Sequence, residues 1–148
     1  MNKKFSLTSF SLLLAFTVSI FSHANEDEQG FVILQKSDLG LSGDRIKTVV
    51  LHGDPNKEGL YIIRILFPAG MSSRPHSHDQ DRFITVIDGT WYAGTQSEYD
   101  MEKTVAIKAG GFMKHPAGAI HFDGAKDEDV VVEIRGMGPV KTTSASRN

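Results

Sequence analysis

GMSSRPHSHDQDRFITVIDG, residues 70–89, is the stretch on which the interpretation of this sequence depends. His76 and His78 are separated by one residue, so in an extended chain their side chains project from the same face. Two imidazoles on one face repel each other when both are protonated, whereas a shared metal ion binds their neutral nitrogens. A lone His-x-His pair is a weak signal, because two unrelated surface histidines produce it as well.

A second stretch, residues 110–121 (GGFMKHPAGAIH), supplies the support that the first one needs. Gly111 opens a strand, and Pro116 and Gly118 favour a tight turn, so His121 falls on the returning strand. In a small β-barrel that strand can face the first pair and contribute a third nitrogen. The sequence therefore predicts His76, His78 and His121 as metal ligands.

The rest of the chain favours an all-β domain. Short runs rich in Val, Ile, Thr, Phe and Tyr alternate with Gly, Pro and Asp, which is typical of a sandwich or small barrel. Asp88-Gly89 predicts a hairpin turn, since glycine adopts positive φ without strain. The predicted core includes Phe83, Ile84, Val86, Ile120 and Phe122. The β runs are 31–34, 45–51, 60–67, 82–87, 90–93, 104–107, 112–115, 120–122 and 130–134.

Both stretches resemble the two motifs of the cupin superfamily. The first motif has the form G-x5-H-x-H-x3-E-x6-G, and here it begins at Gly70 and ends at Gly89. The second has the form G-x5-P-x-G-x2-H, and here it runs from Gly110 to His121. The resemblance implies an all-β double-stranded β-helix (a jelly-roll, or cupin barrel). It also implies a divalent metal ion (Fe, Mn, Zn or Ni), a small-molecule ligand and a homodimer.

The sequence departs from the first motif at Arg82, which occupies the position of the glutamate ligand. A guanidinium has no lone pair and cannot bind a metal. Three interpretations remain open. Arg82 holds an anionic ligand beside a three-histidine metal centre; or a neighbour, Gln80 or else Asp79 or Asp81, replaces the glutamate; or the metal is lost and Arg82 pairs with one of those aspartates.

His115 precedes the Pro116 turn, where the family usually has an apolar residue. It is interpreted as a pocket-lining residue, together with Arg82 and Gln80, because such a histidine is more often a hydrogen-bond partner than a further ligand. His52 lies in a turn and is expected to be solvated.

The first 24 residues predict a cleaved signal peptide. Lys3 and Lys4 precede an apolar run that ends at Ser22-His23-Ala24, with small residues where a signal peptidase cleaves. The domain prediction is a leader at 1–24, a barrel at 25–140 and a flexible polar tail at 141–148. The mature chain would be periplasmic or secreted, and no membrane association is expected after cleavage.

The charge and the cysteine count exclude several classes of partner and site. The full chain has 16 basic and 18 acidic residues; the two leader lysines leave 14 against 18, a formal charge of −4, so nucleic acid is not an expected partner. No cysteine is present, which excludes disulfides and thiolate metal sites. Three hypotheses remain: a metal-dependent dioxygenase or isomerase, which is the activity that the cupin resemblance implies, a non-catalytic barrel that binds a small molecule or metal, and a metal-free relic.

Overall fold

A computed structural model describes residues 26–145, and strands account for most of the ordered elements. The predicted leader at 1–24 and the last three residues, 146–148, lie outside the described range. Within it, no helix is long and apolar enough to cross a membrane. The elements are η1 (Lys36–Leu39), β1 (Lys47–His52), β2 (Gly59–Phe67), β3 (His76–His78), β4 (Arg82–Asp88), β5 (Thr90–Gly94), η2 (Met101–Lys103), β6 (Val105–Lys108), β7 (Phe112–His115), β8 (Phe122–Gly124), β9 (Val130–Gly138) and β10 (Thr142–Ser144).

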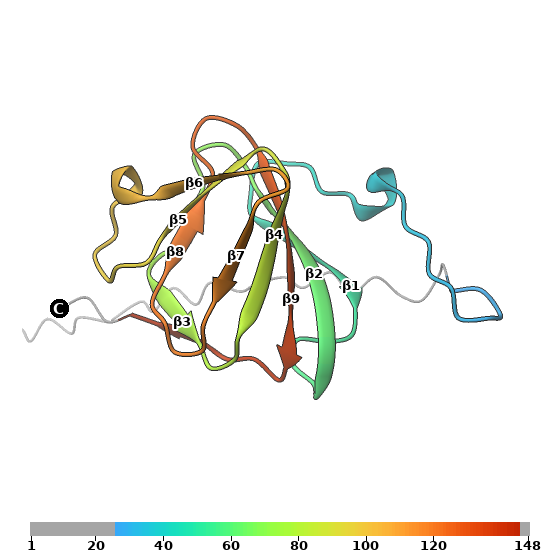
Figure 1. The fold of residues 1–148 in the computed structure, drawn as a ribbon. Helices are drawn as coiled ribbons and strands as arrows, with labels where there is room; N and C mark the ends of the chain where they lie inside the picture. The colour runs from blue at the N-terminus through green and yellow to red at the C-terminus, as the bar shows by residue number, and fades with distance from the viewer. Residues whose placement is uncertain (1–25, 146–148) are drawn as a thin grey trace, which may run out of the picture.

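One wall of the barrel is a five-stranded antiparallel sheet in the order β1-β2-β9-β4-β7 (Figure 1). Paired residues of neighbouring strands share a face, so the register defines rows across the sheet. One inward row is Ile63, Ile134, Ile84 and Met113, and the next is Tyr61, Gly136, Arg82 and His115. The inner face thus changes from aliphatic to polar toward one end of the barrel.

The opposite wall is built from two smaller sheets that isolated bridges join. One sheet has the strand order β6-β5-β8, and the other consists of β10 and β3. Two isolated bridges connect the β3 segment to the β8 segment, namely Ser72–Gly124 and His76–His121. The core between the walls is aliphatic and aromatic. Its fully buried members include Trp91, Phe122, Ile84, Val86 and Val132.

The turn at Asp88-Gly89 is sharp, as the sequence predicts, but it does not form a hairpin. β4 pairs with β7 and β9, whereas β5 pairs with β6 and β8, so the turn carries the chain from one sheet to the other. Gly89 has φ +74°, and a Cβ there would lie 2.5 Å from the Asp129 carbonyl oxygen. Both observations require glycine at this position.

Two members of the predicted core are exposed. Phe83 keeps 42% of its surface exposed and Ile120 keeps 37%, whereas Ile84, Val86 and Phe122 are buried as predicted. The reason for Phe83 is strand alternation: Ile84 and Val86 face the core, so Phe83 faces outward, where Lys114 lies over its ring. The local sequence, Phe83-Ile84, is apolar on both faces and hides this alternation.

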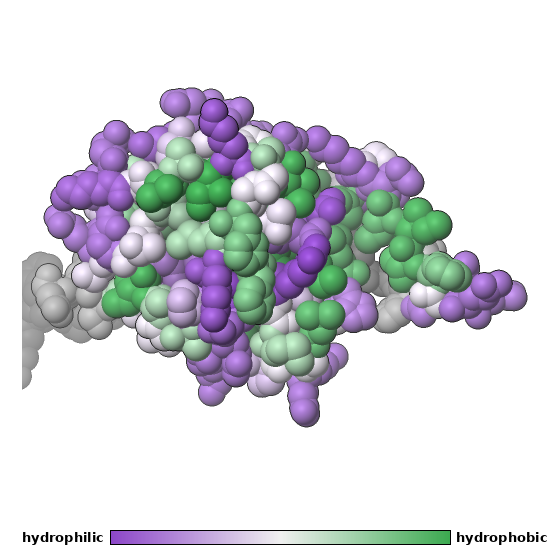
Figure 2. Space-filling view, in the orientation of Figure 1, coloured by the Kyte–Doolittle hydropathy of each residue, from purple (hydrophilic) through white to green (hydrophobic). Residues whose placement is uncertain are grey.

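The ends of the domain differ from the sequence prediction. Thr142–Ser144 forms β10 and pairs with β3 in the region for which the sequence predicts a flexible tail. The predicted run at 31–34 has one bridge residue, Val32, and lies in an exposed N-terminal arm. Figure 2 shows apolar surface on this arm, to which the exposed Phe31 and Ile33 belong.

The inward and outward positions of β4 can be tested by a matched pair of variants. Ile84→Ala is expected to lower the free energy of unfolding by about 2–5 kcal/mol, because it empties part of a core that cannot fully collapse. Phe83→Ala should cost less than about 1 kcal/mol, because the ring is already partly solvated. Urea unfolding of both variants measures the difference; equal losses would contradict the assigned faces.

Candidate metal centre

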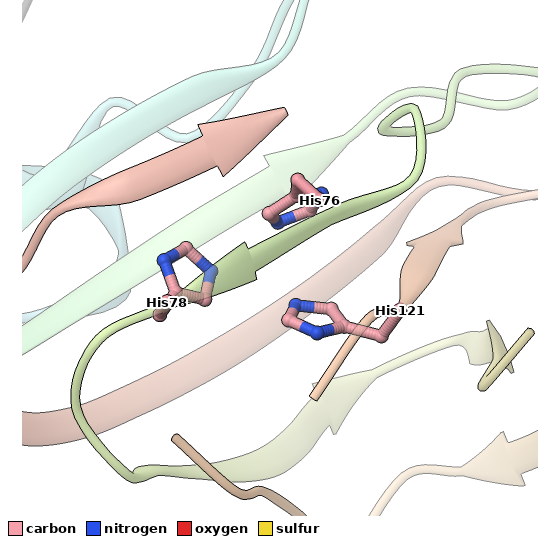
Figure 3. A group of neighbouring side chains, drawn as sticks. All are labelled: His76, His78 and His121. Carbon is pink, nitrogen blue, oxygen red and sulfur yellow. The ribbon is translucent and has the colours of Figure 1, made fainter. Parts of the chain in front are cut away.

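The two histidines of β3 are placed by strand alternation and by the neighbouring β8 segment. His76 and His78 both face the barrel interior, as the His-x-His spacing predicts (Figure 3). His76 and His121 exchange two backbone hydrogen bonds of 2.9 Å each, although they are 45 positions apart in the chain. The bridge brings the third histidine to the first pair.

The three imidazoles converge at one point of the interior. One nitrogen from each lies within 4.8 Å of the other two. The ring centroids are 4.9 Å apart for His76 and His78, 4.4 Å for His76 and His121, and 5.2 Å for His78 and His121. His78 and His121 are buried and His76 is half-buried, so the cluster is most accessible on the His76 side. The predicted ligand set is therefore brought together.

Hydrogen bonds to the outer nitrogens define which ring nitrogen is free. His76 Nδ1 donates to the Arg74 carbonyl oxygen at 2.6 Å, and His121 Nδ1 donates to the Ala119 carbonyl oxygen at 3.0 Å. His78 Nδ1 lies 3.1 Å from the Thr142 hydroxyl on β10. The carbonyl partners leave Nε2 as the lone-pair atom of His76 and His121, and at His78 the guanidinium of Arg82, which can only donate, makes Nε2 the acceptor as well.

The protonation of the rings also suits a ligand. Burial and, to a smaller extent, the nearby charges of Arg82, His76 and His121 together lower the pKa of His78 to about 2. Burial likewise lowers the pKa of His121 to about 4, against the opposing effect of its hydrogen bond to Ala119. These two imidazoles are neutral at physiological pH. The donor set fits a divalent first-row metal ion.

Arg82 points into the barrel and contacts the cluster directly. Its Nη1 donates to Nε2 of His78, the atom that a metal would use. Its Nε has no hydrogen-bond partner, and in the described part of the chain no carboxylate pairs with it as Glu133 pairs with Arg64. Tyr61 lies beside it, in space that Gly136 leaves free, since a Cβ there would be 2.6 Å from the Tyr61 hydroxyl.

The residues proposed to replace the missing glutamate point elsewhere. Gln80 is exposed in the turn between β3 and β4, so it does not line the site. Asp79 accepts a hydrogen bond from the backbone of Lys141, and Asp81 pairs with Lys114 at 2.6 Å. β3 ends at His78, and the turn that follows breaks the alternation on which the Gln80 prediction depended. Neither aspartate pairs with Arg82.

Two further polar residues adjoin the cluster, and sequence reasoning identified only one of them. His115, predicted as a lining residue, is buried on β7 with its ring centroid 3.7 Å from that of His121. Asp123 is buried as well, and no prediction named it. The available signal was its spacing, because it follows His121 by two residues and shares its face.

Burial affects these two residues in opposite ways. It lowers the pKa of His115 to about 2, helped by the charges of the surrounding histidines and Arg82, and it raises the pKa of Asp123. His52 lies at the exposed end of β1, away from the cluster. A separate apolar hollow of about 330 Å³ lies between β5, β6 and β7 and includes none of the histidines in its lining.

Solved structures with the same architecture come from several bacteria. A cupin-like protein from Thermotoga maritima has 17% identity and a TM-score of 0.56, over 70% of this chain and 79% of that one. The polyketide cyclase RemF from Streptomyces resistomycificus has 14% identity and a TM-score of 0.59, over 70% and 72%. The DMSP lyase DddQ from Ruegeria pomeroyi has 16% identity and a TM-score of 0.59, over 78% and 62%.

No protein-family model matches the chain, and no curated protein matches it in sequence. Similarities at these identities define architecture rather than chemistry. The chain has the cupin fold, and the predicted all-β jelly-roll barrel is confirmed.

The buried neutral histidines predict a characteristic loss of stability in acid. Between pH 6.5 and about 4 the unfolded chain binds protons that His78, His115 and His121 do not bind in the folded state. Stability should therefore fall with decreasing pH, by about 1.4 kcal/mol per pH unit for each such histidine. The raised pKa of Asp123 acts in the opposite direction, because the folded state then binds its proton first.

Urea unfolding of metal-free protein at pH 7, 6 and 5 measures this dependence. His115→Asn should reduce the slope by the share of one histidine, whereas His52→Ala should leave it unchanged. A stability that stays constant from pH 7 to pH 5 would contradict the assignment of buried neutral rings.

Proposed function

We propose that this cupin-fold barrel binds one divalent metal ion through Nε2 of His76, His78 and His121. We further propose that it holds a small, negatively charged oxygenated molecule against Arg82. The observation that carries the metal centre is the convergence of one nitrogen from each ring within 4.8 Å of the other two, with Nδ1 of His76 and of His121 bonded to backbone carbonyls so that Nε2 is left as the ligand atom. Three imidazoles suit Fe, Mn, Zn and Ni alike, so the donor set does not select one of them.

Arg82 supports an anionic ligand. Among residues 26–145 this buried guanidinium has an unpaired Nε and forms no ion pair with a carboxylate, and such a group is stabilised by a bound anion. Arg82 also contacts His78 Nε2, so the guanidinium and a metal ion compete for the lone pair of that nitrogen. An anion that pairs with Arg82 would draw it away from His78.

The enzymatic form of the proposal is a metal-dependent dioxygenase or isomerase. A bound divalent ion supplies Lewis-acid polarisation of an oxygen atom or, for a redox-active metal, electron transfer. Arg82 would orient the anionic end of the substrate, and the aliphatic row at Ile63 and Ile84 would exclude water from the remainder. The cyclase and the lyase of the same architecture support chemistry on this fold, but not this reaction.

The second candidate is a barrel that binds its ligand without metal. The contact between Arg82 and His78 favours it, because it satisfies in part the lone pair that a metal would use. In this form the guanidinium and the polar row of Tyr61 and His115 would bind the anion directly. For either candidate, the leader-like pattern at 1–24 supports export of the mature chain.

Loss of any one ligand should abolish tight metal binding. His76→Ala, His78→Ala and His121→Ala are each expected to weaken binding about 100-fold or more, which exceeds the effect of losing an outer hydrogen-bond partner. Elemental analysis of the purified protein and competition with a chelating dye measure content and affinity. His52→Ala serves as the control. Wild-type protein that resists loading with every first-row divalent ion would leave the metal-free candidate.

The role of Arg82 separates metal binding from anion binding. Arg82→Gln should tighten metal binding several-fold, because a buried positive charge and a competitor for His78 are removed. Oxalate binding to the metal-loaded protein should weaken roughly 10- to 100-fold, the loss of about 1.5–3 kcal/mol for a charged hydrogen bond. Calorimetry measures both effects, and Arg64→Gln, on the outer face, is the matched control. Unchanged oxalate affinity would contradict an anion-binding Arg82.

A further inference from the structure

His115 is a buried imidazole whose hydrogen-bonding groups are both unused. It is 3% exposed, and neither Nδ1 nor Nε2 has a partner among the described residues. A neutral imidazole carries one donor and one acceptor, and leaving both unpaired in a protein interior is costly. His121 Nε2 is unpartnered in the same way. Two buried lone pairs are therefore available side by side.

Asp123 completes a second group of donors around His121. Asp123 and His121 project from the same face of the β8 segment, and His115 approaches from β7 on the opposite wall. One donor atom from each of these three residues lies within 4.8 Å of the other two. All three residues are buried, whereas the three-histidine group includes the half-buried His76.

The carboxylate of Asp123 lacks a strong partner of opposite charge. Ser73 Oγ lies 3.3 Å from its Oδ1 and is a neutral donor. The charges of His76 and Arg82 oppose the effect of burial on its pKa, but neither residue forms an ion pair with it in the described part of the chain. A buried carboxylate is stabilised by a cation or by protonation. The interior thus contains a buried carboxyl group, which a bound cation would stabilise as its anion, beside two free nitrogen lone pairs.

We propose that His115, His121 and Asp123 form a second position for a divalent cation, adjacent to the three-histidine centre. His121 has only one inward nitrogen, so the two positions share a ligand and one ion occupies them at a time. Two imidazoles and a carboxylate form a donor set that suits Fe(II), Mn(II) and Zn(II). This inference does not depend on the proposed function, because it requires neither His76 nor His78.

Electrostatics favours the second position in a chain with arginine at residue 82. Three neutral imidazoles leave a dication with its full charge near a buried guanidinium, and like charges repel strongly in a poorly solvated interior. A ligand set that includes Asp123 lowers the total charge by one. Asp123 thereby supplies the negative ligand that the Arg82 substitution removes from β4, but supplies it from β8.

The experiment removes the first position and keeps the second. The double variant His76→Ala/His78→Ala of the full chain is titrated with Co(II), whose visible absorption reports the ligand field. We expect one Co(II) per chain, bound at least about 100-fold more weakly than by the wild type but still measurably. Adding Asp123→Asn to the double variant should abolish this binding, and adding His115→Asn should weaken it at least 10-fold.

Matched controls separate a ligand role from a folding defect. Glu133→Gln in the double variant removes another buried carboxylate, on the outer face of the sheet, and should leave Co(II) binding unchanged. Circular dichroism and the thermal midpoint establish that each variant is folded. A folded double variant that binds no Co(II), or binding that survives Asp123→Asn, would overturn the second position. Failure of the three-histidine centre would instead appear as wild-type affinity in His76→Ala alone.

Discussion

The pair of backbone hydrogen bonds between His76 and His121 is the constraint on which the site depends. β3 has only three residues and belongs to a two-stranded sheet, so it contributes little stability alone. The bridge pairs one edge of β3 with the β8 segment, and β10 pairs with its other edge. Because the bridged residues are themselves histidines, the contact that closes this part of the barrel also aligns the imidazoles.

The consequence is a polar end within an otherwise apolar barrel. Aliphatic residues fill the middle of the five-stranded sheet, whereas the next row contains Tyr61, Arg82 and His115. Such a row costs free energy when it is left without a ligand, since Arg82 Nε and both His115 nitrogens have no partner within the part of the chain that the structure describes. Proteins retain such unpaired groups where a ligand or ion satisfies them, and this reasoning connects the fold to a binding function.

Arg82 and Asp123 together explain how the barrel differs from the cupin motif that it resembles. Arginine occupies the position of the acidic ligand, and the buried carboxylate nearest the histidines comes from β8. In the proposed second position, the acidic ligand comes from β8 instead of β4. The architecture shared with a cyclase and a lyase does not define the chemistry, because the ligands and charges of this site are those of this chain.

The sequence by itself determined the fold class, the three-histidine cluster and the departure from the motif at Arg82, whose direction it left open. Strand alternation places His76 and His78 on one face, and the spacing of Gly, Pro and His in the second motif identifies His121. The tertiary structure alone decided what depends on contacts between distant segments. In the folded chain Gln80 is exposed and Phe83 lies on the outer face of its sheet. Thr142–Ser144 pairs with β3, and Asp123 lies beside His115. The reason is physical: alternation is local and can be read from neighbours, whereas sheet pairing and the burial of a charge are set by segments that the local sequence does not contain.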